Sequence, residues 1–187
     1  EARQRLESRP KRVLLLPPDI TRMHSGAGRL TELLYSQLKD EADVHVIPTL
    51  GQHVPHTQEE NRQMFGAIPN EQIHAHDWRG GCVEVGEIPG EFVREVSQGA
   101  ADWPIPITLN RMLMRESWDW IINVGHVVPH EVLGFANHNK NYFIGLGSNV
   151  GDRLARLRAA EVANDRAARI TGRRQSLMPR TIATSAS

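Results

Sequence analysis

The chain is poor in cysteine, in long apolar segments and in net charge, and each shortage excludes a class of protein. Its one cysteine, Cys82, leaves no intramolecular disulfide and no site built from several cysteines, such as an iron–sulfur cluster. No apolar run approaches the ~20 residues that a membrane-spanning helix requires. The formal net charge is +0, so no overall field favours nucleic acid or an anionic membrane.

The N-terminus lacks two further features. Residues 1–12 are charged, without the apolar centre of a signal peptide, and the sequence does not begin with methionine. We therefore expect a cytoplasmic protein, with the given sequence a piece of a longer one. Its 187 residues, 40% hydrophobic and 24% charged, suit one soluble globular domain.

Short apolar runs alternate with helical patterns along most of the chain. The run Val13–Leu16 is typical of a strand buried on both faces, and a helix pattern opens after residues 25–28. Further strands are expected at 44–50 and 120–125, and Thr57 with Glu60 forms a capping-box signature for another helix. This alternation predicts an α/β fold, a three-layer Rossmann-like domain with a mainly parallel sheet.

Other segments give weaker patterns. Residues 74–85 suggest a strand pair or a strand and loop, residues 90–96 fit a helix or a strand, and 109–114 suggest a helix. Beyond residue 150 the chain becomes rich in arginine and alanine, and 175–187 has little that could build a core. We therefore divide the chain into a domain over 1–147 and a divergent tail over 148–187, helical at first and then disordered.

Three polar clusters follow the three best predicted strands. Asp19 and Arg22 follow the first strand, His53 follows the second, and His130 with Lys140 follows the third. Ligands of parallel α/β sheets collect beyond the carboxyl ends of the strands, so these clusters predict one site. Arginine grips carboxylates through two hydrogen bonds, histidine moves protons near neutral pH, and a pocketed lysine can serve as a nucleophile or a covalent anchor.

Each cluster also has a purely structural interpretation. Asp19 and Arg22 could form a surface ion pair, or Asp19 could cap a helix start. Residues 25–28 could cradle a phosphate or simply form a loop before a helix. The pairs His53/His56 and His74/His76 could bind a metal or be ordinary hydrogen-bonded histidines. The loop that holds His126, His130, His138 and Lys140 could be a polar loop whose histidines are all hydrogen-bonded.

Several separate motifs, in order, resemble the N-terminal domain of the lactate racemase-like family. They span about Lys11 to Gly147 and read DITRMHSGAG at 19–28, LGQHVP at 50–55, HDWR at 76–79, VVPHEVLG at 127–134 and NKNYFIG at 139–145. The resemblance implies a racemase of small α-hydroxy acids that uses a nickel-pincer nucleotide. The motifs look closer to the hydroxyacid racemase homologues than to lactate racemase itself.

The resemblance also implies a role for each matched residue. His53 and His130 would be opposed acid/base histidines, and Arg22 would hold the substrate carboxylate. Asp19 would order the cofactor end of the site, while Lys140 would carry the cofactor as a covalent thioamide. The reaction would move a hydride from the α-carbon to the cofactor and return it on the other face.

The chain departs from the family pattern after Gly147. Family members carry a nickel-binding histidine beyond the lysine, whereas no histidine follows His138 here, and they are about twice as long, with a second domain. The alternative is therefore an inactive fragment that binds a nucleotide or a small carboxylate. Residues 142–154 also resemble the opening strand and loop of hydroxymethyl-dihydropterin pyrophosphokinases, but the few residues that follow are too few for that fold.

Overall fold

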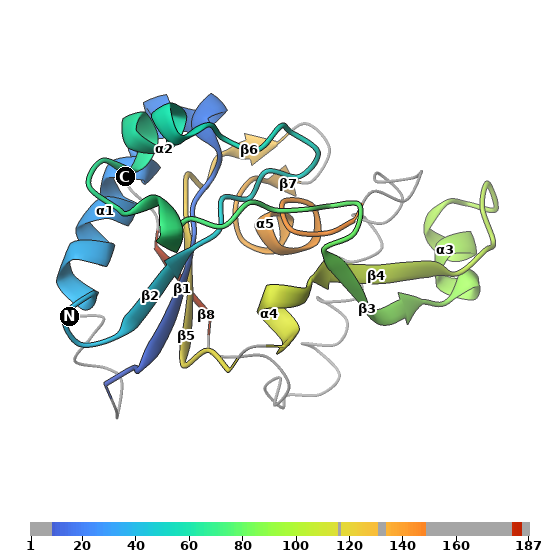
Figure 1. Cartoon of the computed structure of the whole chain (residues 1–187). Coiled ribbons are helices and arrows are strands. Elements are labelled where there is room, and N and C mark those ends of the chain that lie inside the picture. The colour runs from blue at the N-terminus through green and yellow to red at the C-terminus, as the bar shows by residue number, and fades with distance from the viewer. Residues whose placement is uncertain (1–8, 116, 131–133, 149–180, 185–187) are drawn as a thin grey trace.

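The centre of the molecule is a four-stranded parallel sheet. The structure, a computed structural model, describes residues 9–115, 117–130, 134–148 and 181–184. The strands are β1 (Arg12–Leu16), β2 (Asp43–Val46), β5 (Trp120–Val124) and β8 (Thr181–Thr184), in the order β2-β1-β5-β8 (Figure 1). Every neighbouring pair is parallel, which confirms the predicted α/β fold with a mainly parallel sheet.

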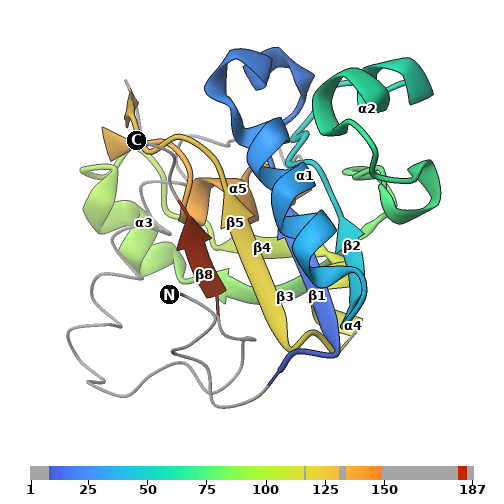
Figure 2. The ribbon, with the colours of Figure 1, turned by 90° about the vertical axis from the view of Figure 1, so that its left-hand side faces the viewer.

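Helices cover both faces of this sheet and make it the middle of three layers. Helices α1 (Ala27–Leu38) and α2 (Gln58–Phe65) lie on one face, with α4 (Arg111–Arg115) and α5 (Asn139–Phe143) on the other (Figure 2). Successive strand residues point to opposite faces, so β1 feeds two separate cores. Val13 and Leu15 belong to the α1/α2 core, whereas Leu14 and Leu16 belong to the other, and all four are fully buried.

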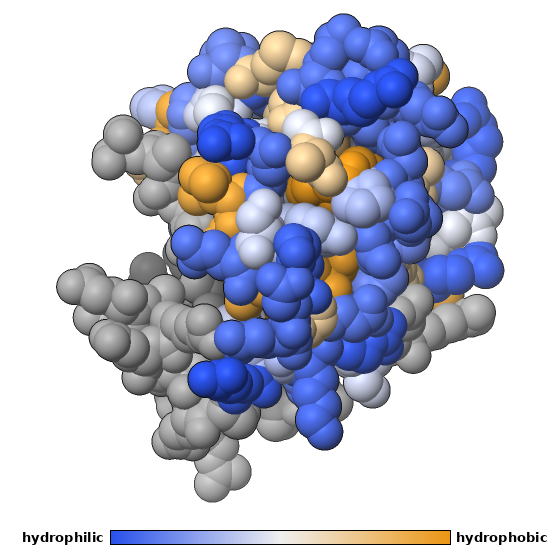
Figure 3. Space-filling view, turned by 60° about the vertical axis from the view of Figure 1, so that its left-hand side comes forward, coloured by the Kyte–Doolittle hydropathy of each residue, from blue (hydrophilic) through white to orange (hydrophobic). Residues whose placement is uncertain are grey.

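Helices α1 and α2 meet at a glycine. A Cβ atom on Gly28 would lie 2.0 Å from the backbone oxygen of Met64, so only glycine permits this approach. The predicted capping box of α2 is present: the Glu60 backbone N–H donates to Thr57 Oγ1 at 3.2 Å, and the Thr57 N–H donates to Glu60 Oε2 at 2.7 Å. The outer face over these helices is largely hydrophilic (Figure 3).

An arm made of two strands and a short helix projects from the sheet (Figure 1). Its strands β3 (Cys82–Ile88) and β4 (Ile105–Asn110) pair antiparallel, and α3 (Gly90–Val96) connects them. Ile88, Val93 and Ile105 form a small core within the arm. The open choice for residues 90–96 is thus settled as a helix.

Several predicted boundaries need correction. The second strand ends at Val46, because Pro48 cannot donate to a sheet ladder. Of the two alternatives for residues 74–85, the strand and loop is correct, since β3 begins at Cys82 and residues 74–81 contain no strand. Leu109 and Asn110 end β4, so the helix expected from 109 begins only at Arg111. The segment that resembles a pyrophosphokinase strand is instead helical at residues 142–143, within α5.

The tail is described only in part. Thr181–Thr184 form β8 in a segment for which we expected no ordered structure, because their backbone pairs with Ile121–Val124 at the sheet edge. The helix predicted for 153–174 lies outside the described residues, and the division at residue 147 stays a prediction. None of the described helices is long and apolar enough to cross a bilayer.

Candidate active site

A pocket of about 230 Å³ opens at the carboxyl ends of β1 and β5. The chain continues from β1 to β2 on one side, whereas β5 flanks β1 on the other, so these two strand ends form the topological switch point of the sheet. The described lining comes from the segments after β1 and β5 and from the start of α5: Pro18, Arg22, His24, Ser25, Gly125, His126, Val128, Ala136, Asn137, Lys140 and Asn141. The sequence predicts its polar clusters at this edge, and the structure places Arg22 of the first cluster and Lys140 of the third in the pocket there.

Arg22 and Lys140 line this pocket together, although they are far apart in the sequence. Arg22 lies in the short 3₁₀ helix η2 (Ile20–Ser25), and Lys140 lies in the first turn of α5. Among the described lining residues none is acidic, whereas two are cationic and two more are histidines. Such a set favours an anion, either a carboxylate or a phosphate.

Asp19 and His53 form a hydrogen-bonded pair beside the pocket. The carboxylate of Asp19 is buried, 5% exposed, and accepts a hydrogen bond from His53 Nδ1. Its other oxygen accepts the Thr21 backbone N–H at 2.9 Å, so Asp19 also caps η2, as one of the two structural interpretations expected. The side chain of His53 is 58% exposed, which leaves its Nε2 accessible in a fixed ring orientation.

His130 is not among the described residues that line the pocket. It ends β6 (Pro129–His130), which pairs with β7 (Gly134–Phe135) in a hairpin after β5. The Ala136 backbone N–H donates to the Val128 carbonyl at 2.8 Å, and both of these residues line the pocket. The structure thus brings the His130 hairpin to the pocket, while its position opposite His53 stays a prediction.

The other predicted histidine pairs have structural partners. His56 Nε2 accepts the Ile20 N–H at 2.9 Å, and its Nδ1 lies 3.1 Å from Asn61 Oδ1. His76 is buried, accepting from Asn110 Nδ2 at 2.9 Å and donating to the Gly147 carbonyl at 3.1 Å. Among the described residues, no group of three or more His, Cys, Asp or Glu is arranged to hold a metal.

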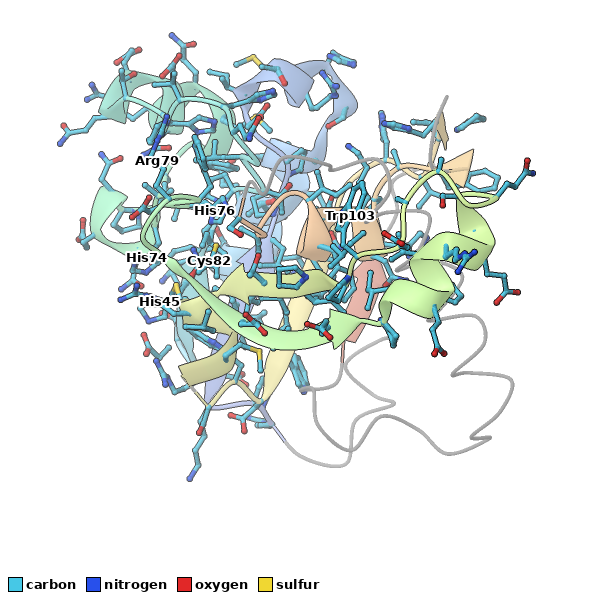
Figure 4. The ribbon with its side chains drawn as sticks, turned by 90° about the vertical axis from the view of Figure 1, so that its right-hand side faces the viewer. His45, His74, His76, Arg79, Cys82 and Trp103 are labelled. Atoms are coloured by element: carbon cyan, nitrogen blue, oxygen red, sulfur yellow. The ribbon has the colours of Figure 1, made fainter. Side chains whose placement is uncertain are left out.

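His74 pairs with another strand instead. Its Nε2 lies 2.8 Å from His45 Nδ1 on β2, and His74, His76 and Cys82 follow one another along the segment that leads into β3 (Figure 4).

Burial raises the pKa of the Cys82 thiol to about 11, so it stays protonated at neutral pH and makes a poor nucleophile.

The glycines of residues 25–28 have packing roles. Gly26 adopts a left-handed φ of 72° at the junction of η2 and α1, and Gly28 permits the contact with Met64. Ser25 Oγ accepts the Ala27 N–H at 3.2 Å and lines the pocket. The segment therefore serves as a helix connection, and its predicted phosphate role stays a prediction.

The sequence interpretation missed a group of buried polar residues between β5 and α5. Three buried asparagines, Asn123, Asn137 and Asn141, join β5 to α5 through side-chain hydrogen bonds. The one available signal was Asn123, a polar residue inside an otherwise apolar run. His24 and His126 line the pocket and were given no site role either.

Comparison with known families assigns this architecture. A model of the lactate racemase N-terminal domain matches residues 2–151, most of the chain. The chain belongs to this family. The match includes the whole pocket and both of its cationic residues, Arg22 and Lys140. A comparison with curated proteins finds no match.

Two solved structures share the fold of this lactate racemase-like domain. A protein from Thermotoga maritima superposes with a TM-score of 0.70 at 26% identity, over 88% of this chain and 46% of that one. The lactate racemase apoprotein from Thermoanaerobacterium thermosaccharolyticum gives a TM-score of 0.57 at 23% identity, over 74% of this chain and 31% of that one. The chain thus spans less than half the length of either protein.

Proposed function

We propose that this chain is the acid/base and cofactor-anchoring half of a racemase or epimerase of small α-hydroxy acids that uses a nickel-pincer nucleotide. The observation that carries the proposal is the meeting of Arg22 and Lys140 in one pocket without a described acidic residue, beside the Asp19–His53 pair. A second domain would complete the site. The single cysteine is consistent with a cytoplasmic protein.

The described residues fit one part of this cofactor better than the other. The cationic lining suits the phosphate of a nucleotide, and Lys140 supplies an amine for a covalent link. A set of protein ligands for nickel is not formed by the described residues, and no histidine follows His138 in the sequence. The residues present therefore fit the nucleotide and its anchor, but not a protein ligand set for the metal.

The protein would bind the substrate and move its hydroxyl proton. The bound cofactor supplies the hydride acceptor. Arg22 would hold the substrate carboxylate through its planar fork. His53, with its ring oriented by Asp19, would take the hydroxyl proton at Nε2, and His130 would do so from the other face, each returning it afterwards.

A second candidate is a binding domain without turnover, which holds a nucleotide or a small carboxylate. The missing histidine after His138 favours this candidate. Isothermal titration with nucleotides and hydroxy acids, beside a racemisation assay, separates the two. Binding without racemisation by the cofactor-treated chain supports the second candidate, and measurable turnover eliminates it.

The proposal is tested at Lys140. The protein is produced together with the enzymes that make the cofactor, and its peptides are analysed by mass spectrometry. We expect an adduct on Lys140, none on Lys11 or Lys39, and none in Lys140→Arg, which keeps the charge but cannot form the link. An unmodified Lys140 beside a modified control racemase would refute the proposal. His53→Ala and His130→Ala should fold normally and lose any turnover.

A further inference from the structure

Lys140, in the first turn of α5, is next in sequence to one of three buried amide side chains. Asn123 comes from β5, Asn137 from the loop before α5, and Asn141 from α5 itself, next to Lys140 in sequence. They are 0%, 4% and 8% exposed, respectively. Asn137 and Asn141 also line the pocket. We call these three residues the amide cluster.

The hydrogen bonds of the amide cluster form a closed set between the strand and the helix. Asn141 Nδ2 donates to Asn123 Oδ1 and to Asn137 Oδ1, both at 2.7 Å. Asn123 Nδ2 donates to the His138 carbonyl at 2.9 Å, and Asn137 Nδ2 donates to the Gly125 carbonyl at 3.2 Å. Three of these four bonds therefore join the chain around Lys140 to Asn123 or Gly125 at the end of β5.

The buried amide of Asn123 would destabilise the fold if it did not make these hydrogen bonds. The other β5 residues are apolar and buried, and an unpaired buried amide costs about 1–3 kcal/mol. Apolar contacts alone would hold α5 on the sheet without fixing its orientation, because such contacts are not directional. Hydrogen bonds of fixed length and angle instead define where the first turn of α5 lies.

The loop that enters α5 carries backbone strain. Asn137 and His138 have φ values of 65° and 47°, in the left-handed region that residues other than glycine rarely adopt. Such strain persists only where the surroundings fix the conformation. The amide cluster does so here, and the Lys140 backbone N–H donates to the Asn137 carbonyl at 3.1 Å directly after the strained pair.

From these contacts we infer that Asn141 and Asn123 are positioning residues that aim Lys140 into the pocket. The inference deepens the proposed function, since an aimed amine is what a covalent anchor requires. It concerns the placement of the side chain, however, and this is measurable without any cofactor.

The test compares the reactivity of two lysines in the same molecule. Trace acetylation, quantified by peptide mass spectrometry, gives the ratio of the Lys140 rate to the rate of the exposed Lys11. Asn141→Leu removes both donor bonds at similar volume. The double variant Asn123→Leu/Asn141→Leu removes both partners of the strand–helix bond, so neither side chain of that bond is left unpaired, although the His138 carbonyl and Asn137 Oδ1 also lose a donor. Asn139→Leu, on the other side of Lys140, is the matched control.

We expect a ratio below one in the wild type and in Asn139→Leu. The ratio should rise at least threefold toward one in Asn141→Leu and in the double variant, with the circular dichroism spectrum unchanged. An unchanged ratio in a folded double variant overturns the inference. This outcome is separate from the proposed function. If the wild type forms no adduct, the proposed cofactor is refuted, but the reactivity ratio still tests whether the asparagines position Lys140.

Discussion

His53 donates its Nδ1 hydrogen to the buried carboxylate of Asp19, which comes from the loop after a different strand. The carboxylate therefore selects the ring tautomer whose Nε2 is the free proton acceptor. Because Asp19 also caps η2, the helix that holds Arg22, one carboxylate connects the orientation of His53 with the placement of Arg22.

Replacing Asp19 by asparagine tests this connection. The amide keeps the shape but no longer selects a single tautomer, so His53 should populate both. Nitrogen NMR of the imidazole should show one tautomer in the wild type and a mixture in Asp19→Asn. Turnover of the cofactor-loaded enzyme should fall by about a hundredfold or more. An unchanged imidazole spectrum in the variant would contradict the assignment.

The contact of Gly28 with Met64 predicts a position that is sensitive to substitution. Gly28→Ala should destabilise the fold by about 1–3 kcal/mol, because the new methyl group forces α1 and α2 apart. Urea unfolding measures the change. Gly86→Ala is the matched control: nothing lies within 4 Å of its added Cβ, so its effect should stay within about 0.5 kcal/mol. Equal effects would show that the helix contact is not tight.

Asp119 predicts a loss of stability in acid. Its carboxylate accepts the backbone N–H groups of Arg12 at 2.9 Å and Lys11 at 2.7 Å, and these bonds lower its pKa. A lowered folded pKa gives stability that is present above the ordinary carboxyl value and is lost as the pH falls through the folded value.

The variant Asp119→Asn should therefore be less stable than the wild type at pH 7, by about 0.5–1 kcal/mol for this exposed group. The difference should shrink as the pH falls below the ordinary carboxyl value. Urea unfolding across this pH range checks both parts. Asp102→Asn, whose carboxylate has no hydrogen bond among the described contacts, is the matched control.

Cys82 should resist alkylation. With its pKa raised to about 11 by burial, the thiolate fraction at pH 8 is about a hundredfold smaller than in the unfolded chain. Iodoacetamide should therefore label the native protein far more slowly than the protein in urea, as mass spectrometry can follow. Similar rates in the two states would show that the thiol is not shielded.

Local patterns predicted the parts of this molecule that local physics decides. The uninterrupted apolar run of β1, the helix pattern of α1 and the capping box of Thr57 and Glu60 all gave correct elements. The positions of Asp19, Arg22 and Lys140 after strands predicted their common edge of the sheet. Their chemical roles stay predictions, because the amine chemistry of Lys140 depends on a ligand as well as on the fold.

Long-range partners account for what the sequence could not predict. His56 looked like a partner of His53, yet it accepts the Ile20 N–H from another segment. The amide cluster joins residues from two elements, and an asparagine alone does not reveal its partner. The strand β8 is defined by pairing with β5 rather than by its own composition.

The outer end of the arm should tolerate an insertion better than the rest of the domain. Because Ile88, Val93 and Ile105 close a core of their own, its outer turn at Gln98 and Gly99 stands apart from the packing around the pocket. A fluorescent reporter or a purification tag inserted at that turn should leave the pocket undisturbed.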